Sequence, residues 1–285
     1  MTAKKDVAKK DVAKKDENKE LANAEFMFED AGAGMETADK DSFAIPFLSV
    51  LQKISPQVDE AEAEYIEGAK AGMLLNTVTQ KLYDGKTGVI FLPCAYQRRF
   101  LRWGPRGTSD GGFKGEIMPE EAARLRDAGE VVDKEGKLYF PLNDGSIDEK
   151  KCDHLADTRN HFGILVDEET GEAQQVLLSL GSTQIKKSKM LMSLLNSAKI
   201  KGPKGLVTPP TWANRIRLTT AQESNDKGSW MGLKVQPAEP KFVQSKDLYD
   251  IGKAFHATIA SGEAKVNYEA APGAATGTEE DGGKF

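Results

Sequence analysis

The sequence predicts a mainly β fold with helices, of the α+β class, arranged as a small barrel or sandwich elaborated by three or four helices. Short runs of β-branched and aromatic residues pair as hairpins across turns that contain glycine. A few other stretches place apolar residues at helical spacing. With 285 residues, 39% of them hydrophobic, the chain is long enough to bury a core without disulfides or metals.

The first elements follow from local composition. Residues 42–54, SFAIPFLSVLQKI, predict a short helix or a buried segment, interrupted by Pro46. Residues 87–103 predict strands on either side of Cys94, because they are rich in β-branched and aromatic side chains. Residues 119–126 begin with proline and two acids, which favours a short helix, and 137–141 is a short strand.

Two hairpins are predicted in the second half of the chain. Residues 161–166 and 173–180 flank an acidic turn that ends near Gly171. Residues 212–220 and 229–236 read as two strands joined by Asn-Asp-Lys-Gly. Paired strands of this length favour a barrel or a sandwich over a helical bundle.

Two longer helices are predicted around these hairpins. Ser182 and Thr183 are candidate N-caps of a helix that runs to about Ser197 and carries a broad apolar stripe. A loop rich in glycine and proline follows over 202–210. Residues 246–260 have the spacing of a second helix, which the next Ser-Gly ends.

The ends of the chain differ from its middle. Residues 1–40 begin with a repeated Lys-Lys-Asp-Val-Ala unit whose single valine cannot build a core, so we predict a disordered lysine-rich tail. Residues 41–268 are the predicted single domain. Residues 269–285 are a flexible acidic tail, in which Glu279, Glu280, Asp281 and the terminal Phe285 offer a contact to partner proteins or to a basic surface of the same chain.

Several classes of function are disfavoured. No apolar run is long enough to span a membrane, no signal peptide is recognisable, and two cysteines are too few for a disulfide framework, so we expect a cytoplasmic protein. Common hydrolase and nucleotide-binding motifs are missing. Cys152, Asp153, His154 and His161 do not have the spacing of a common zinc site. We therefore predict no enzyme, no cofactor and no metal.

Positive charge is concentrated in two windows of an otherwise acidic chain. Residues 94–114 hold five cations and one acid, a charge of +4, and residues 181–234 hold ten cations and two acids, a charge of +8. The whole chain has a charge of −5, which leaves −17 for the rest. Solvated faces would not need such segregation, so the windows favour an anionic partner.

Both windows interleave cations with aromatic residues. Single-stranded nucleic acid presents phosphates and unstacked bases, so its binder needs cations and flat rings but no sequence readout. On a strand, Tyr96, Arg98, Phe100 and Arg102 would share one face, with Arg99 and Trp103 opposite, so some of the aromatic residues belong to the core. The predicted nucleic-acid-binding residues are Tyr96, Arg98, Arg99, Phe100, Arg102, Trp103, Arg106, Lys114, Lys186, Lys187, Lys189, Trp212, Arg215, Arg217, Trp230 and Lys234.

Several stretches resemble phage-encoded single-stranded DNA-binding proteins, over roughly residues 42–262. They are YIEGAKAGMLLNTVTQKLYDGKTGVIFLPCAYQRRFLRWGPR, GGFKG, LLSLGSTQIKKSKMLMSLL, NDKGSWMGLKV and LYDIGKAFHATIASGE. The resemblance implies an OB-type barrel with appended helices that acts in phage replication and recombination. It also implies an acidic tail ending in an aromatic residue, but here Lys284 precedes Phe285 and only three acids stand before them.

The leading hypothesis is therefore sequence-tolerant binding of single-stranded DNA in the host cytoplasm, with replication or recombination proteins contacting the tail. The two windows would form one cationic groove, and the protein would be a monomer or a homo-oligomer. One alternative is a scaffolding component of a phage particle or replication complex, whose basic windows contact acidic proteins. Another is a metal-dependent nuclease or recombinase that uses acids such as Asp153 and Asp157.

Overall fold

A computed structural model describes residues 33–37 and 42–268, apart from 106, 169, 227 and 265. The chain divides into two units, Met1–Phe43 and Ala44–Phe285, and every helix and strand named below lies in the second. The predicted acidic C-terminal tail and most of the predicted N-terminal tail lie outside the described residues.

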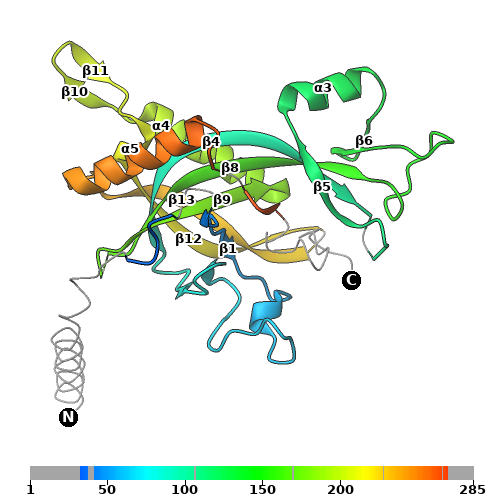
Figure 1. Cartoon of the computed structure of the whole chain (residues 1–285), viewed down its shortest axis with the longest axis horizontal. Coiled ribbons are helices and arrows are strands. Elements are labelled where there is room, and N and C mark those ends of the chain that lie inside the picture. The colour runs from blue at the N-terminus through cyan, green and yellow to red at the C-terminus, as the bar shows by residue number, and fades with distance from the viewer. Residues whose placement is uncertain are drawn as a thin grey trace. The chain divides into compact units, whose positions relative to one another are not determined.

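Two long antiparallel strands, β4 and β8, form the middle of the main sheet. The strand order is β13-β12-β4-β8-β7-β6, while β5 pairs with β4 and β9 pairs with β8. The sheet curls into a half-barrel (Figure 1). Its strands are β4 (Val89–Gly104), β5 (Gly112–Ile117), β6 (Val132–Lys134), β7 (Lys137–Tyr139), β8 (His154–Val166), β9 (Ala173–Gly181), β12 (Asn214–Asn225) and β13 (Gly228–Phe242).

Strand β4 joins the two strands that the sequence predicts over 87–103. Its first half is apolar and buried on both faces, as is usual for a strand in the centre of a covered sheet. The register with β8 shifts between Pro93 and Ala95, which forms a bulge at Cys94. Proline has no N–H to give to a ladder, so a bulge is a favourable place for it. The strand continues beyond the bulge instead of ending there.

Both predicted hairpins are confirmed as β8–β9 and β12–β13. The predicted loop over 202–210 overlaps a further, short hairpin, of β10 (Ile200–Gly202) and β11 (Gly205–Val207). Gly205 has φ +118, a conformation that glycine adopts without strain. Gly202, Pro203 and Gly205, which favour a loop in the sequence, lie at the turn of this short hairpin.

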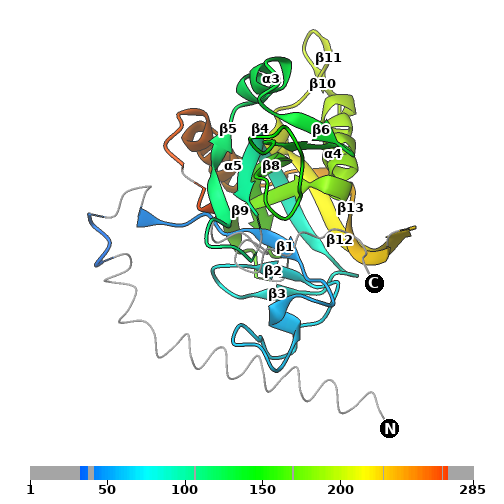
Figure 2. The same cartoon turned by 90° about the vertical axis from the view of Figure 1, so that its right-hand side faces the viewer.

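A small second sheet contains β1 (Leu48–Val50), β2 (Leu74–Asn76) and β3 (Leu82–Tyr83), and lies below the main sheet in Figure 2. The helix expected for residues 42–54 is therefore wrong, although its alternative, a buried segment, is confirmed. The carbonyl of Pro46 accepts a hydrogen bond of 2.8 Å from the N–H of Leu177 on β9. Pairing with an existing strand holds this segment extended.

Three α-helices are present among the described residues: α3 (Pro119–Asp127), α4 (Ile185–Ser197) and α5 (Lys246–Ala260). All three are predicted from the sequence. The predicted caps of α4 are wrong, because Ser182–Gln184 forms a 3-10 turn and no side chain caps the helix. In α5 the Ser245 hydroxyl does accept from the N–H of Leu248.

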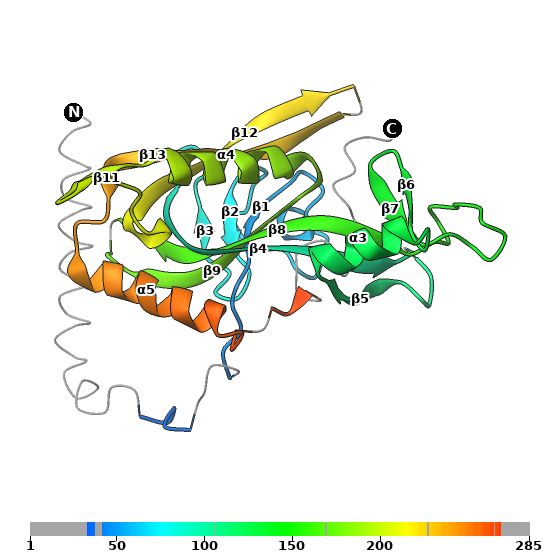
Figure 3. The same ribbon diagram turned by 90° about the horizontal axis from the view of Figure 1, so that it is seen from above.

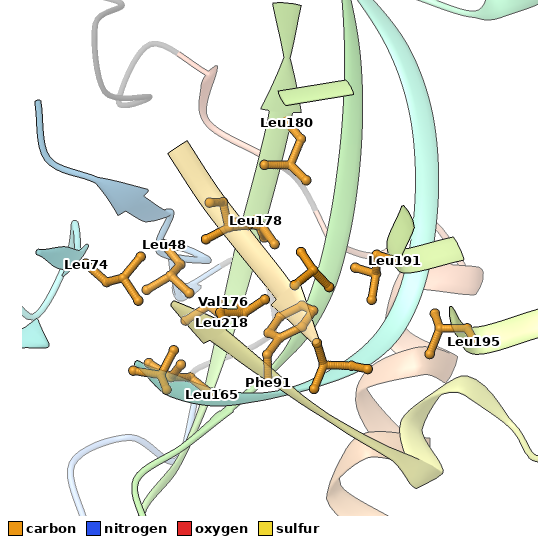
Figure 4. Packing of buried hydrophobic residues seen from close by; sticks show 14 residues of the cluster. Leu48, Leu74, Phe91, Leu165, Val176, Leu178, Leu180, Leu191, Leu195 and Leu218 are labelled. Atoms are coloured by element: carbon orange, nitrogen blue, oxygen red, sulfur yellow. The ribbon is translucent and has the colours of Figure 1, made fainter. Parts of the chain in front are cut away.

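The core has two main layers, one on each face of the curled sheet. On the inner face, Phe91 of β4 and Leu218 of β12 pack with Leu191 and Leu195 of α4 (Figure 4). On the outer face, Ile90 and Leu92 pack under α5. Two smaller clusters lie under α3 and beside the small sheet. Helix α4 therefore covers one face of the sheet and α5 the other (Figure 3).

Candidate nucleic-acid interface

The register between β4 and β8 decides which side chains of the first basic window share a face. Tyr96 pairs with His161, Arg98 with Arg159, and Phe100 with Asp157, all on the inner face. Arg99 and Trp103 point to the outer face. The predicted alternation is confirmed, so no single face of the strand can present the whole window.

Beyond α4, the inner face of β4 and β8 carries a polar network that we call the saddle, made of Tyr96, Arg98, Asp157 and Arg159. The Asp157 carboxylate accepts from Nε and Nη2 of Arg98, at 2.9 and 2.7 Å. It also accepts from Nε and Nη2 of Arg159, both at 2.9 Å. Arg159 Nη1 donates to the Tyr96 hydroxyl at 3.1 Å. One carboxylate therefore holds two guanidinium groups in place.

The saddle has a net charge of +1 despite its acid. Burial by itself would raise the pKa of Asp157, but the hydrogen bonds from Arg98 and Arg159 outweigh burial and lower that pKa. Arg98 keeps 39% of its side chain exposed, whereas Arg159 keeps 15%. Tyr96 is also exposed. The saddle thus presents to solvent one partly exposed arginine side chain, held by Asp157, and one exposed aromatic ring.

A buried histidine connects the saddle to α4. His161 Nε2 is 2.8 Å from the Ser188 hydroxyl of α4, and its ring centroid is 5.1 Å from that of Tyr96. Burial, and secondarily the charge of Arg159, lowers the pKa of His161 to about 4. The ring is therefore neutral at physiological pH, and it serves here as a packed connection between the helix and the sheet.

The remaining cations of the first window are paired with acids. Asp153, just before β8, accepts from Arg102 Nε at 2.7 Å and from Lys114 Nζ at 2.8 Å. On the outer face, Arg99 Nε lies 3.5 Å from a carboxylate oxygen of Glu116. Each pair removes a charge that the sequence analysis assigned to phosphate binding. Arg106 lies outside the described residues.

Most aromatic residues of the two windows pack inside the protein. Phe100 belongs to the cluster under α3, and Trp103 contacts Phe113 with ring centroids 5.5 Å apart. Trp212 packs against His256 of α5 at 4.8 Å. Trp230 is half-buried, and its indole nitrogen is one of three buried polar side-chain atoms that lack a partner among the described residues. Tyr96 is the most exposed ring of the predicted set.

The arginines of the second window are also paired, and they lie on the other side of the sheet. Ile216 pairs with Phe91 on the inner face, so its neighbours Arg215 and Arg217 point outward. Both arginines donate to Glu168, each at 2.7 Å. Lys187 of α4 pairs with Glu223. Arg215 and Arg217 therefore do not share a face with Tyr96 and Arg98, which corrects that part of the predicted groove.

The lysines that keep their charge available lie mainly on and after α4. Lys186 and Lys189 are exposed on the helix and Lys234 is exposed on β13, and within the described part of the chain none of them contacts a carboxylate. Sequence reasoning missed Arg159. Arg159 lies outside both basic windows, and only the register of β8 with β4 brings it opposite Arg98.

The residues considered for metal chemistry are engaged separately. Asp153 is held by Arg102 and Lys114, and His161 by Ser188, while Cys152 is buried. Within residues 33–37 and 42–268, as far as they are described, no three His, Cys, Asp or Glu side chains are arranged to hold a metal ion. Nor does this part of the chain contain a helix long and apolar enough to cross a lipid bilayer.

A family model described as Pam3 phage gp34-like protein matches residues 14–265, and it indicates a phage protein. No curated protein and no solved structure matches the chain significantly. Because the matched region covers most of its length, the chain belongs to the Pam3 phage gp34-like protein family.

Proposed function

We propose that this phage protein binds single-stranded DNA without sequence preference, and that its half-barrel is an OB-type barrel. The order of strands and helix along the chain supports the second point. In the main sheet β4, β8 and β9 precede α4 in the chain and β12 and β13 follow it, and β4 pairs with both β8 and β12. Other elements are inserted between them, namely β5, α3, β6 and β7 after β4, and β10 and β11 after α4. An OB fold is a five-stranded, partly open Greek-key barrel, and we propose that these five strands form it.

The observation that carries the proposed binding is a long structured segment without acids. Residues 173–222 contain eight lysines and arginines and no aspartate or glutamate. Within it, α4 exposes Lys186 and Lys189 on the surface opposite its buried Leu191 and Leu195. Lys187, Arg215 and Arg217 of this segment pair with acids outside it. Lys186 and Lys189 contact no carboxylate among the described residues, so their charge is available to phosphates, and the release of counterions would drive binding at low salt.

The saddle supplies the second kind of contact that single-stranded DNA needs. The ring of Tyr96 is exposed. The side chain of Arg98, which Asp157 holds, is partly exposed as well. Stacking of a base on such a ring contributes on the order of 1–3 kcal/mol and does not depend on base identity. The contacts from Tyr96 through His161 to Ser188 attach the saddle to α4. We place the DNA across this side of the sheet.

This placement differs from the usual OB interface, which uses the outer face of the second and third strands. Here the ring of Phe162 on β8 contacts Phe255 of α5, with centroids 6.4 Å apart, and α5 covers that face. Arg215 and Arg217 are engaged by Glu168. Our proposal therefore assigns the phosphate contacts to α4 and the saddle, and not to the arginines of β12.

Titration of a fluorescent oligo(dT) at two salt concentrations tests the proposal. We expect saturable binding that weakens steeply with salt, and a preference over a duplex of the same length. The variant K186Q/K189Q should bind more weakly and with a shallower salt dependence, by about 1.4 in the slope of log affinity against log salt. K53Q/K70Q is the matched control, since it removes two exposed lysines outside the acid-free segment.

Two results would reject this function. Absence of oligonucleotide binding at low salt would leave the scaffold alternative, in which the protein acts in phage assembly without DNA affinity. Cleavage of the oligonucleotide in magnesium, abolished by D153N, would favour the nuclease instead. In a replication or recombination role, the protein would protect single strands in the host cytoplasm and recruit other proteins through residues 269–285.

A further inference from the structure

The β10–β11 hairpin projects away from the rest of the fold (Figures 1 and 3). Ile200 pairs with Val207 and Lys201 with Leu206, while Gly202 and Gly205 close the turn. Among the described residues these strands pair only with each other. An isolated two-stranded ribbon is at best marginally stable in water. We therefore expect a role of this hairpin in binding rather than in the packing of the core.

The hairpin exposes apolar side chains that a purely structural loop would not need. Leu206 is 74% exposed, Val207 44% and Ile200 38%. A Cβ added at Gly205 would meet no atom within 4 Å, so open space surrounds the turn. Ile200 and Val207 share one face of the ribbon, and Leu206 lies on the other face with Lys201. Exposed apolar residues on a projecting element mark a surface that a partner covers.

The charge of the hairpin indicates the chemistry of that partner. Lys201 and Lys204 are exposed and contact no carboxylate in the described part of the structure. Lys199, at the base, is held by the Thr208 hydroxyl and the Asn196 carbonyl. The hairpin lies inside the acid-free segment 173–222. Lysines beside apolar side chains complement a polymer that carries phosphates together with flat, apolar base faces.

We infer that β10–β11 is a nucleic-acid-binding arm, in which Lys201 and Lys204 contact phosphates and Leu206 packs against an unstacked base. The inference rests on the proposed function and extends it to a surface outside the barrel. The arm follows α4 in the chain, separated from it only by Ala198 and Lys199. A strand of DNA on the lysines of α4 can therefore continue onto the arm.

Three variants test the arm without touching the core. K201Q/K204Q should weaken oligo(dT) binding about tenfold at low salt and lower the salt slope by about 1.4, as expected for two lost phosphate contacts. L206S should weaken binding about fivefold at every salt concentration and leave the slope unchanged. Replacement of residues 201–206 by Asn-Gly keeps the Ile200 and Val207 pair on a two-residue turn and should combine both losses.

Controls separate the arm from the rest of the protein. The three variants should unfold at the temperature of the wild type, and K53Q/K70Q should bind as the wild type does. Amide exchange of residues 200–207 should slow when oligo(dT) is added. If the wild type binds oligo(dT) and the arm variants bind it equally well, the inference that the arm binds nucleic acid is wrong, whereas the proposed function of the protein stands.

Two further outcomes are decisive. Conversion of an oligomer to a monomer by the Asn-Gly replacement, with unchanged DNA affinity, would overturn the inference and make the arm a contact between copies of this chain. If the wild type binds no oligonucleotide at all, the proposed function fails, and the arm fails with it.

Discussion

Asp157 of β8 accepts two hydrogen bonds from Arg98 of β4, and the same carboxylate holds Arg159. Two cations that lie 61 positions apart in the chain are therefore oriented by one acid. Buried or half-buried ion pairs position side chains more than they stabilise a fold, because desolvation offsets much of their attraction. In this protein Asp157 orients the partly exposed Arg98 side chain. It also orients Arg159, which donates a hydrogen bond to the Tyr96 hydroxyl.

Removal of that carboxylate should be costly. D157N leaves two guanidinium groups without their anion in a half-buried site, and we expect it to lower the free energy of unfolding by about 2 kcal/mol. Urea denaturation checks this value. E116Q breaks the longer and more exposed pair with Arg99 and should cost less than about 1 kcal/mol. Equal losses in the two variants would contradict the orienting role of Asp157.

Glycine at position 163 is required by the packing of β4 on β8. A Cβ there would lie 2.4 Å from the ring of Phe91 and 2.5 Å from the carbonyl oxygen of Leu92. We expect G163A to destabilise the protein by about 3 kcal/mol or more, measured by thermal or urea unfolding. At Gly181 a Cβ would meet only the carbonyl oxygen of Asp157, at 3.6 Å, so G181A should be nearly neutral.

The buried histidine predicts a specific loss of stability in acid. The pKa of His161 is about 4 in the folded protein, against an ordinary value near 6.5 when unfolded. Between these pH values the unfolded chain binds a proton that the folded chain does not. The stability that His161 contributes is therefore complete above pH ~6.5, and it falls by about 3 kcal/mol as the pH drops toward 4.

Comparison with a variant isolates this effect from the titration of carboxylates. H161Q can still hydrogen-bond to Ser188 but does not titrate, so its free energy of unfolding should change less than that of the wild type between pH 6.5 and 4. Urea midpoints at several pH values measure the difference. Parallel curves for the two proteins would show that His161 is not responsible.

The paired arginines of β12 should be dispensable for DNA binding. Glu168 already satisfies Arg215, whose side chain is largely buried. We expect R215Q to change the affinity for oligo(dT) by less than about twofold, while lowering stability by about 1 kcal/mol because Glu168 loses one partner. Oligonucleotide titration beside K186Q/K189Q makes the comparison. A larger loss for R215Q would move the interface to the outer face of the sheet.

Local patterns predicted most elements of this fold. The proline and acids before α3, the apolar spacing of α4 and α5, and the turns of both long hairpins all depend on neighbours within a few residues. The helix predicted for residues 42–54 was wrong because β2 pairs with Leu48–Val50 and β9 forms a bridge with Phe47, and both partners are distant in the sequence. The hairpin at 200–207 was not predicted because each strand has only three residues, and the glycines and proline at its turn favour a loop.

By itself the sequence determined the class of the fold, the positions of its helices and long strands, and the alternation of side chains along β4. Tertiary structure alone decided which cations remain available. Arg102 and Arg215 face acids that lie far away in the chain, whereas Lys186, Lys189 and Lys201 face none among the described residues. The reason is physical: side-chain direction follows from local geometry, but the charge that a group presents depends on partners brought to it by folding.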